Sequence, residues 1–575
     1  MKKLRFLALV QAAALSVSLL ASCGSQQQTS SVSDSGGTSS TPTGTTSSGK
    51  TNMFGWEIPA ETIEITAFNS NGEYAPSEEE KIGRENMEKY ILENFNVKLN
   101  MITTDGDGSE AINLALASDT YPDLLYDADY DTVLKFKKQN KAQDLTPYMD
   151  TVGKDIKEKI GDTYPLLLDE EDKLWYIPIG VNELMEMPDR AVHIRYDEYL
   201  AIGSPKIETP DDYYNALKEI LKANPTNPNG ETRYAMSLFN DQNYVRDFGG
   251  YWGFRNGWEV GDDNSFTYWT DTEQGKNMSK WFNQIYRDGL FDPDAFNNTF
   301  DDWKAKFSNE RIVGAIGQWW TVYNAGHEVW QGLDPTVDPN KRYIQLGFKA
   351  PGVEQTYSTG KVRTGGAYTI ITDKAKNVED IMKFINFQAT DVGLALFNWG
   401  IPNGVPSNKD ASVMVKEWNI DEDGNWEFDA VARAQFLSET WDYVQEALLG
   451  TATYPFFNYY DRWSDGVHHV WASNMWFSEN KWKTMMIDNL KDSIYDSSAF
   501  TLLEKSEETI LTEQAFRDAW TQYWPSVIQA KSDAEFDANW TTLQNAVKGA
   551  NIDSYAKVME DNYKKNMEKL SKLNG

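Results

Sequence analysis

The sequence predicts an α/β protein of two lobes, each with a mainly parallel sheet, followed by a helical C-terminal part. Three observations support this class. The chain has 575 residues and becomes globular in composition at Met53, which leaves enough length for at least two domains. Strand and helix patterns alternate through the first two thirds. From about Ser407 the strand patterns fade and helical, aromatic-rich segments follow.

The first 22 residues have the pattern of an export signal. Basic residues precede an apolar run from Phe6 to Leu20, which is shorter than the roughly 20 residues of a membrane-spanning helix. Leu20 to Cys23 resemble a bacterial lipobox, and Cys23 is the single cysteine of the chain. We therefore expect a signal peptide at 1–22 and a lipid on Cys23. The Ser/Thr/Gly-rich residues 23–52 should form a flexible tether on the outer face of the cytoplasmic membrane.

The folded part begins with a strand, helix, strand unit. Ile63, Ile65 and Ala67 alternate as a strand that opens into the loop 69–73. Ser77 and Glu80 fit a capping box for a helix, and a second strand follows from Val97.

The same alternation continues along the chain. "PDLLYDADYDTVLKF" predicts a strand and a helix, and "KLWYIPIGV", "RAVHIRYDEYL" and "GKVRTGGAYTIIT" predict strands. "TPDDYYNALKEILKA" predicts a helix with Thr209 as its cap and Pro210 in its first turn. "NVEDIMKFINFQATDVGLALFN" predicts another helix. The chain ends in two helices that are separated at residues 549–552.

Composition and motifs restrict the function. The net charge of −33, or −36 once the three cations of the signal are removed, repels nucleic acid. No phosphate-binding glycine loop, zinc-protease pair or nucleophile elbow occurs, so we expect no catalytic residues. A glycoside hydrolase stays open as an alternative, since two carboxylates suffice for it.

Aromatic residues point to a carbohydrate site. The chain has 21 Trp, 29 Tyr and 26 Phe, clustered in segments such as "YWGFRNGW" and "QWWTVY". A sugar ring combines an apolar face with a rim of hydroxyls, so its site needs flat aromatic surfaces and polar side chains. Trp319 and Trp320 are adjacent, so in a strand only one of them could face a cleft.

Several segments, in order, resemble the extracellular solute-binding proteins of family 1, the carbohydrate-binding lipoproteins of ABC importers in Gram-positive bacteria. They are "LALASDTYPDLLYDADYD", "DLTPYMD", "HIRYDEYLAIGSPKIETPDDYYNALKEI", "WFNQIYRDGLFDPDAF", "ITDKAKNVEDIMKFINFQATDVGLALFNWGI" and "SDAEFDANWTTL". The resemblance implies the two-lobed type II periplasmic-binding-protein fold, with ligand between the lobes. It implies lobe 1 at 53–190 and 351–406, lobe 2 at 191–350, and a C-terminal segment 407–575 packed mainly on lobe 2.

The resemblance implies that Tyr126, Asp127 and Asp129 lie at the rim of the cleft, and position and residue type complete a set of candidate ligand residues. They are Asn71, Glu73, Tyr126, Asp127, Asp129, Trp252, Arg255, Trp319, Trp320, Arg363 and Trp399. Many relatives carry a calcium loop where this chain has "NPTNPNGETRYAM". Here Asn224, Asn227, Asn229 and Glu231 supply a single carboxylate, so we expect a proline-stiffened turn and no cofactor.

The predicted function is that of a monomeric, lipid-anchored binding protein. It would bind a neutral or mildly polar oligosaccharide and deliver it to ABC permease subunits, without catalysis. A surface glycoside hydrolase, a glycan-sensing lipoprotein and a peptide-binding protein are the alternatives that the sequence leaves open.

Overall fold

The computed structural model describes twelve stretches of the chain. They are residues 47–70, 78–102, 108–181, 190–239, 248–334, 336–361, 364–406, 414–415, 418–428, 456, 458–459 and 480–573. Cys23, the signal and most of the tether lie outside them. Within the described residues, no helix combines the length and apolar character needed to cross a membrane.

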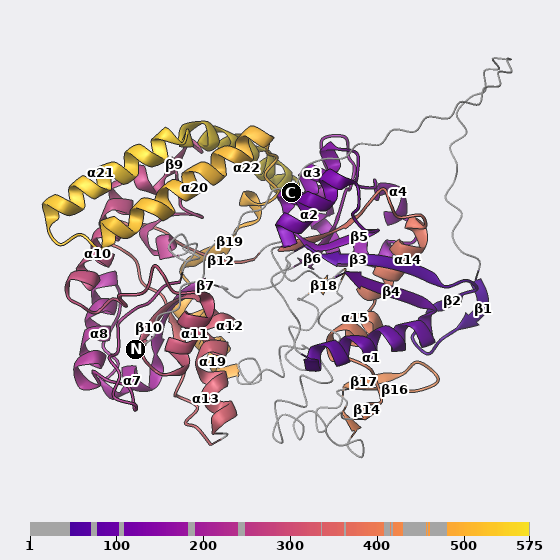
Figure 1. The fold of residues 1–575 in the computed structure, drawn as a ribbon, viewed down its shortest axis with the longest axis horizontal. Helices are drawn as coiled ribbons and strands as arrows, with labels where there is room; N and C mark the ends of the chain where they lie inside the picture. The colour runs from indigo at the N-terminus through magenta and orange to yellow at the C-terminus, as the bar shows by residue number, and fades with distance from the viewer. Residues whose placement is uncertain are drawn as a thin grey trace, which may run out of the picture. The chain divides into compact units, whose positions relative to one another are not determined.

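A six-stranded sheet organises the first core, in the order β18-β6-β13-β5-β3-β4 (Figure 1). The strands are β3 (Ile63–Asn69), β4 (Val97–Ile102), β5 (Leu124–Ala128), β6 (Ile177–Val181), β13 (Ala367–Ile371) and β18 (Asn458–Tyr459). β3 runs parallel to β4 and β5, while β13 runs antiparallel to β5 and β6. β18 runs parallel to β6. Five of these six strands therefore point the same way, as predicted for this lobe.

Helices with one apolar face complete the first core. They are α1 (Glu78–Phe95), α2 (Gly108–Ser118), α3 (Tyr130–Lys138), α4 (Thr146–Met149), α5 (Lys154–Ile160), η1 (Gly161–Thr163), α6 (Tyr164–Leu167), α14 (Val378–Ala389) and α15 (Asp391–Trp399). The single helix predicted over α14 and α15 is two helices, because Thr390 adopts an extended backbone and caps α15 by accepting the Gly393 N–H.

A hairpin leads into the first core. It consists of β1 (Ser47–Thr51) and β2 (Glu57–Pro59), which pair antiparallel. Asn52 holds the turn, because its side-chain oxygen accepts the N–H groups of Phe54 and Trp56. The indole of Trp56 donates to the carbonyl of Phe95 at the end of α1. These bonds fix the hairpin beside the amino ends of β3 and β4.

The second sheet differs from the prediction of a mainly parallel sheet. It has the order β10-β7-β11, with β7 (Arg190–Arg195), β10 (Gly314–Gln318) and β11 (Tyr343–Leu346). β7 runs antiparallel to both neighbours, because this central strand passes through the sheet in the opposite direction to the flanking pair. The segment "RAVHIRYDEYL" is a strand only to Arg195 and continues as α7 (Tyr196–Ala201).

Helices and short strands surround the second sheet. They are α8 (Pro210–Ala223), η2 (Gly249–Trp252), β8 (Trp258–Val260), β9 (Phe266–Tyr268), η3 (Trp269–Asp271), α10 (Glu273–Arg287), α11 (Phe300–Ser308), α12 (Trp319–Ala325) and α13 (His327–Leu333). The predicted start of α8 is confirmed: Thr209 and Asp212 form a capping box, with Pro210 in the first turn.

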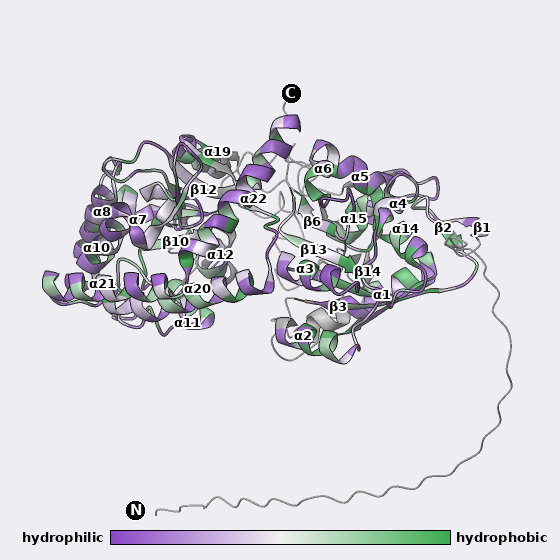
Figure 2. Ribbon diagram, turned by 90° about the horizontal axis from the view of Figure 1, so that it is seen from above, coloured by the Kyte–Doolittle hydropathy of each residue, from purple (hydrophilic) through white to green (hydrophobic). Residues whose placement is uncertain are grey.

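The C-terminal helices pack on the second core. They are α19 (Asn480–Leu490), η6 (Ser498–Phe500), α20 (Glu507–Ile528), α21 (Asp533–Gly549) and α22 (Ile552–Leu573). Trp520, Trp524 and Trp540 from these helices are buried in that core with Trp269. Hydrophilic and hydrophobic residues mix along α20 and α21, as expected of surface helices with one apolar face (Figure 2).

The expectation that strands end at about Ser407 is wrong. Among the described residues beyond it there are five short strands, namely β15 (Met414–Val415), β16 (Trp418–Ile420), β17 (Trp426–Phe428), β18 and β19 (Ser493–Asp496). β15 pairs with β14 (Val405–Pro406), and β19 runs parallel to β12 (Thr356–Lys361). Most of these strands have two or three residues, which is too few for an alternating pattern to show in a sequence.

Candidate functional site

The strands of the first sheet end at a common edge. β3, β5 and β6 are parallel, so Asn69, Ala128 and Val181 all lie at their carboxyl ends. β13 is antiparallel and enters the sheet at the same edge, with Tyr368 opposite Ala128. In open α/β sheets this edge is where ligands bind. The edge brings together three predicted ligand residues, Tyr126, Asp127 and Asp129.

β5 carries an irregularity at this edge. Tyr368 pairs with Ala128 and Ile370 with Leu125, so β5 has one extra residue between these two pairs. Asp127 lies within this β-bulge and has a φ of 56°, a left-handed conformation that is uncommon for a non-glycine residue. Bulges re-aim side chains, and strained backbones gather at functional sites. The bulge therefore marks Asp127 as the most distinctive residue of the edge.

Tyr126 and Asp129 have structural partners as well. The ring of Tyr126 is 6% exposed and stands edge-on to Phe456, with 5.5 Å between ring centroids. Burial raises the pKa of Tyr126, and a hydrogen bond with Asn69 partly offsets this rise. Asp129 is exposed, and one of its carboxylate oxygens accepts the N–H of Thr132 at 2.7 Å, which caps α3.

Two further residues at this edge were not among the sequence candidates. Ser70 follows β3 and is 7% exposed, with its N–H bonded to the carbonyl of Tyr126 at 2.9 Å. Its hydroxyl has no hydrogen-bond partner among the described residues. Arg84 in α1 lies close enough to Tyr126 to act on its ionisation. Ser70 could have been found from its place after a predicted strand, whereas nothing in the sequence singled out Arg84.

The remaining candidates are placed elsewhere or not described. Trp252 is 6% exposed and belongs to the second core. Arg255 stacks on Tyr357, 4.3 Å from its ring centroid, and donates to the hydroxyl of Tyr563 at 3.3 Å. The structure thus does not bring either of them to the edge residues of the first sheet. Asn71, Glu73 and Arg363 lie outside the described residues.

The three other tryptophans are at helix ends. Trp319 and Trp320 are the first two residues of α12, since β10 ends at Gln318. Their backbone is therefore helical, whereas a strand was considered from the sequence. Trp399 is the last residue of α15.

The loop compared with calcium loops is satisfied by its own side chains. The amide nitrogen of Asn227 donates to Glu231 at 2.8 Å and to the carbonyl of Asn309 at 2.8 Å. The amide oxygen of Asn227 accepts the N–H groups of Asn229 and Glu231. The N–H of Gly230 bonds to the carbonyl of Asn227, which closes the turn. A nitrogen that donates to the loop's only carboxylate does not fit a calcium site, which needs several oxygen ligands.

In the part of the chain that the structure describes, no group of three or more His, Cys, Asp or Glu side chains is arranged so that it could hold a metal ion. Another acidic loop, residues 421–425, is the turn between β16 and β17. Asp421 accepts the N–H groups of Asp423 and Asn425 in that turn.

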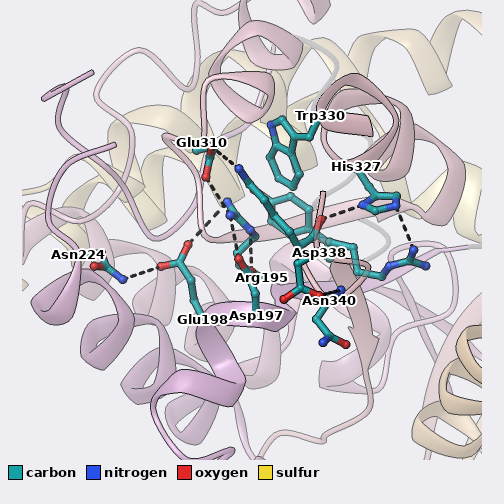
Figure 3. A network of polar contacts seen from close by, with 12 residues as sticks. Arg195, Asp197, Glu198, Asn224, Glu310, His327, Trp330, Asp338 and Asn340 are labelled. Carbon is teal, nitrogen blue, oxygen red and sulfur yellow. Dashed lines mark hydrogen bonds and ion pairs between the residues drawn. The ribbon is translucent and has the colours of Figure 1, made fainter. Parts of the chain in front are cut away.

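A buried ionic cluster supports the loop 224–233, which was compared with calcium loops (Figure 3). Arg195 is 2% exposed and contacts Asp197 at 2.9 Å, Glu310 at 2.9 Å and Glu198 at 3.6 Å. Its guanidinium also lies over the ring of Trp330, 4.4 Å from the centroid. Three carboxylates around one guanidinium would repel each other without further cations.

Those cations come from the neighbouring strands and loops. Arg233 binds Glu198 through two nitrogens, at 2.5 and 2.8 Å, and Lys341 binds Glu310 at 2.7 Å. Glu198 also accepts from Asn224 at 3.4 Å. Glu198 therefore ties both ends of the loop 224–233 to α7.

A cavity of about 620 Å³ lies at the opposite side of the first core. Its lining comes from the β1–β2 turn, α5, the start of α15 and the β16–β17 turn, and it includes Asp155, Glu158, Asp391 and Trp426. None of the candidate ligand residues lines it. We therefore keep the bulged edge as the candidate site.

The two cores, and the edge at the carboxyl ends of the first sheet's parallel strands, are features of a two-lobed, periplasmic-binding-protein-like fold. Residues 80–394 match the family model described as bacterial extracellular solute-binding protein. This match covers more than half of the chain, so the protein belongs to that family of binding proteins, which are not enzymes. A comparison with curated proteins gave no match.

Solved structures agree on the fold. FusA, an ABC-transporter substrate-binding protein of S. pneumoniae in complex with kestose, has a TM-score of 0.65 at 17% identity, covering 88% of this chain and 100% of FusA. The alginate-binding protein AlgQ2, solved without calcium ion, has a TM-score of 0.64 at 16% identity, covering 88% and 99%. An HMO-binding, ABC-transporter-associated protein of Bifidobacterium longum infantis has a TM-score of 0.61 at 14% identity, covering 87% and 98%.

Proposed function

We propose that this protein is the lipid-anchored, extracellular binding protein of an ABC importer and that it binds an oligosaccharide between its two lobes. The observation that carries the proposal is the bulged edge at Asp127, in a chain of the solute-binding family. Closure of the lobes around the ligand would produce the form that docks on the permease. The transport energy then comes from a separate ATPase, so this chain needs no catalytic residue.

The ligand class follows from chemistry and from the relatives. Asp127 supplies a carboxylate and Ser70 an uncommitted hydroxyl at the edge, which suits the donors and acceptors of sugar hydroxyls. The similar proteins named above are described as binding alginate, kestose and HMO. The aromatic faces would come from Trp319, Trp320 and Trp399.

We propose a neutral or mildly polar sugar. The mature net charge of −36 opposes a polyanion, which would need local arginines. Arg255, one of the two arginines among the candidate ligand residues, already stacks on Tyr357 and donates to the hydroxyl of Tyr563.

Attachment and partners complete the proposal. Cleavage before Cys23 and acylation of its thiol would hold the protein at the outer face of the cytoplasmic membrane, within reach of the permease subunits. The protein would act as a monomer, without a cofactor. The loop 224–231 supports a metal-free state, because Asn227 and Glu231 already bond to each other.

The lobe boundaries are also a proposal, with lobe 1 at 53–190 and 351–406 and lobe 2 at 191–350. Ala350 in the second core and Tyr368 in the first support a change of lobe between them, but Val353, which the limits assign to lobe 1, packs in the second core. Within the C-terminal segment, Trp418 and Phe456 pack in the first core, and residues from Trp482 to Tyr563 pack in the second.

Isothermal titration of the mature chain against a panel of neutral and acidic oligosaccharides tests the function. We expect saturable binding of a neutral member and no release of reducing ends. Turnover of a glycan would instead establish a glycoside hydrolase. Binding without uptake by cells that carry the gene would favour a glycan sensor.

A further inference from the structure

Residues 499–504 pass between the two cores. Phe500 and Leu503 pack with the second core, whereas Leu502 packs with the first. The segment follows β19, which runs parallel to β12, and Thr356 and Ser493 join these two strands through their hydroxyls at 2.8 Å. We call residues 499–504 the C-terminal crossover.

The backbone of this crossover is bonded by side chains of α22 and not by a sheet. Asn562 accepts the N–H of Glu504 at 3.0 Å and donates to its carbonyl at 3.2 Å. Asn566 donates to the carbonyls of Ala499 at 3.1 Å and Thr501 at 2.8 Å. The two asparagines are four residues apart, so they share one face of α22.

Burial makes these bonds the strongest link between α22 and the crossover. Asn562 is 7% exposed, and buried backbone groups are costly to leave without partners. Asn562 also donates to the carbonyl of Val558 in its own helix, which fixes its orientation. On the far side of the crossover, the hydroxyls of Thr364 and Thr501 lie 2.8 Å apart, which joins it to the segment before β13.

The same end of α22 contacts the first core. Lys565 pairs with Glu170 at 2.7 Å, and Lys569 donates to the carbonyl of Leu168 at 2.9 Å. The Lys565 and Glu170 side chains are 57% and 82% exposed, so this pair adds little stability. The hydrogen bonds of Asn562 and Asn566 therefore hold this region to α22 more strongly than the contacts of Lys565 and Lys569 do.

We propose that α22 fixes the pivot of lobe closure, with Asn562 and Asn566 as positioning residues for the C-terminal crossover. The inference rests on the proposed function, in which the lobes close around a ligand. A crossover held at four backbone groups bends only at its ends, so the lobes follow one path of closure. Without the two asparagines the crossover samples more conformations, and the spread of lobe positions widens.

Hydrogen exchange in the full chain tests the first step. In N562A/N566A we expect the Glu504 amide to exchange about tenfold faster than in the wild type, because it loses its acceptor. N562D retains an acceptor oxygen and should keep the amide close to wild-type protection. N545A, which removes an exposed asparagine of α21, is the matched control and should change nothing.

Spin-label distances test the second step without any sugar. Labels on cysteines placed at Lys89 and Lys222, both highly exposed, report on the two lobes in a chain that also carries C23A. The distance distribution should be broader in N562A/N566A than in the parent, and N562D should lie between them. Unchanged exchange at Glu504, or faster exchange with an unchanged distribution, would overturn the proposal. Failure of the oligosaccharide titration alone would affect the proposed function and leave these two results standing.

Discussion

The side-chain amide of Asn227 donates a hydrogen bond to the carboxylate of Glu231, with 2.8 Å between nitrogen and oxygen. This bond occupies the carboxylate that a metal ion would need, in the loop that the sequence resemblance compares with calcium loops. The loop is held at its ends by Glu198, which contacts Asn224 and Arg233. Hydrogen bonds and buried ion pairs thus do the structural work of a bound cation.

The first prediction concerns this loop. In N227D two carboxylates face each other, and the donors to Glu231 and Asn309 are lost, so unfolding should cost about 1–3 kcal/mol less. Urea denaturation measures the change, and added calcium should restore part of it in N227D only. N229D, at an exposed side chain of the same loop, is the control. A wild-type protein that loses several degrees of Tm with a chelator would contradict the metal-free loop.

The second prediction concerns the ionic cluster. Arg233 is almost fully buried and binds Glu198 through two nitrogens, so R233M leaves a buried carboxylate short of a partner. We expect a loss of about 3 kcal/mol in the free energy of unfolding. K206M removes the exposed pair with Glu208 and should cost less than about 1 kcal/mol. Equal effects of the two variants in urea denaturation would show that burial of the cluster does not matter.

The third prediction concerns pH. Arg342 donates to Nε2 of His327 at 3.0 Å, so Nδ1 carries the proton that is donated to the carbonyl of Lys341. Burial, with the charge of Arg342, lowers the pKa of His327 to about 4. Burial alone lowers the pKa of His193 to about 4, although its bond to the carbonyl of Gly317 acts in the opposite direction.

The direction in which stability changes with pH follows from the pKa of these histidines in the folded and the unfolded protein. An unfolded histidine takes up its proton near pH 6.5, whereas these folded histidines do so only near pH 4. Their stabilisation is complete above pH 6.5 and is lost as the pH falls toward 4, by up to about 3 kcal/mol per residue. Unfolding free energies between pH 4.5 and 7.5 measure the slope. H327Q should reduce this slope by an amount that corresponds to at most one proton taken up on unfolding. An unaltered slope would rule out His327 as a contributor.

The fourth prediction concerns the ligand edge. D127N keeps the size of the side chain, and asparagine tolerates the left-handed backbone at this bulge. Loss of a charge-assisted hydrogen bond should weaken binding of the sugar found in the titration by about 10- to 100-fold. E61Q, at an exposed carboxylate before β3, is the matched control. An unchanged Kd in D127N would remove Asp127 from the site.

The fifth prediction separates the anchor from the site. C23A should release the protein from the membrane fraction into the medium, because it removes the thiol that would carry the lipid. Ligand affinity of the released protein should equal that of the wild type. Immunoblotting of cell fractions and titration of the released chain measure the two effects, and weaker binding by C23A would show that anchor and site are coupled.

Several elements of both cores could be predicted from the sequence. The alternation at Ile63 and Ile65, the cap at Thr209 and the break near Asn551 are local signals, and the corresponding elements are present. The antiparallel second sheet was not predictable, because the direction of a strand relative to its neighbours depends on contacts far along the chain. β18 and β19 were missed for the same reason, since each joins a strand more than 130 residues away.

Only part of the candidate ligand site could be predicted from the sequence. Tyr126 and Asp127 lie at the end of a recognisable strand and Asp129 follows it, and the family resemblance places this strand end at the ligand site. The bulge could not be predicted, because it arises from a shift in the pairing with Tyr368 and Ile370. Trp252 has the composition of a sugar-stacking residue, and its burial comes from the way η2 packs in the second core.

The β1–β2 hairpin determines from which end the folded protein is attached. Asn52 donates to the carbonyl of Asn94, and Ile63 at the start of β3 bonds to Asn96, so the hairpin lies at the amino ends of the strands. The candidate ligand residues lie at the carboxyl ends, about 20 Å further along the seven residues of β3. The proposed anchor upstream of Ser47 would therefore join the folded part at the amino ends of these strands and not at the edge that carries the candidate ligand residues. A change in the length of the tether should then leave ligand affinity unchanged.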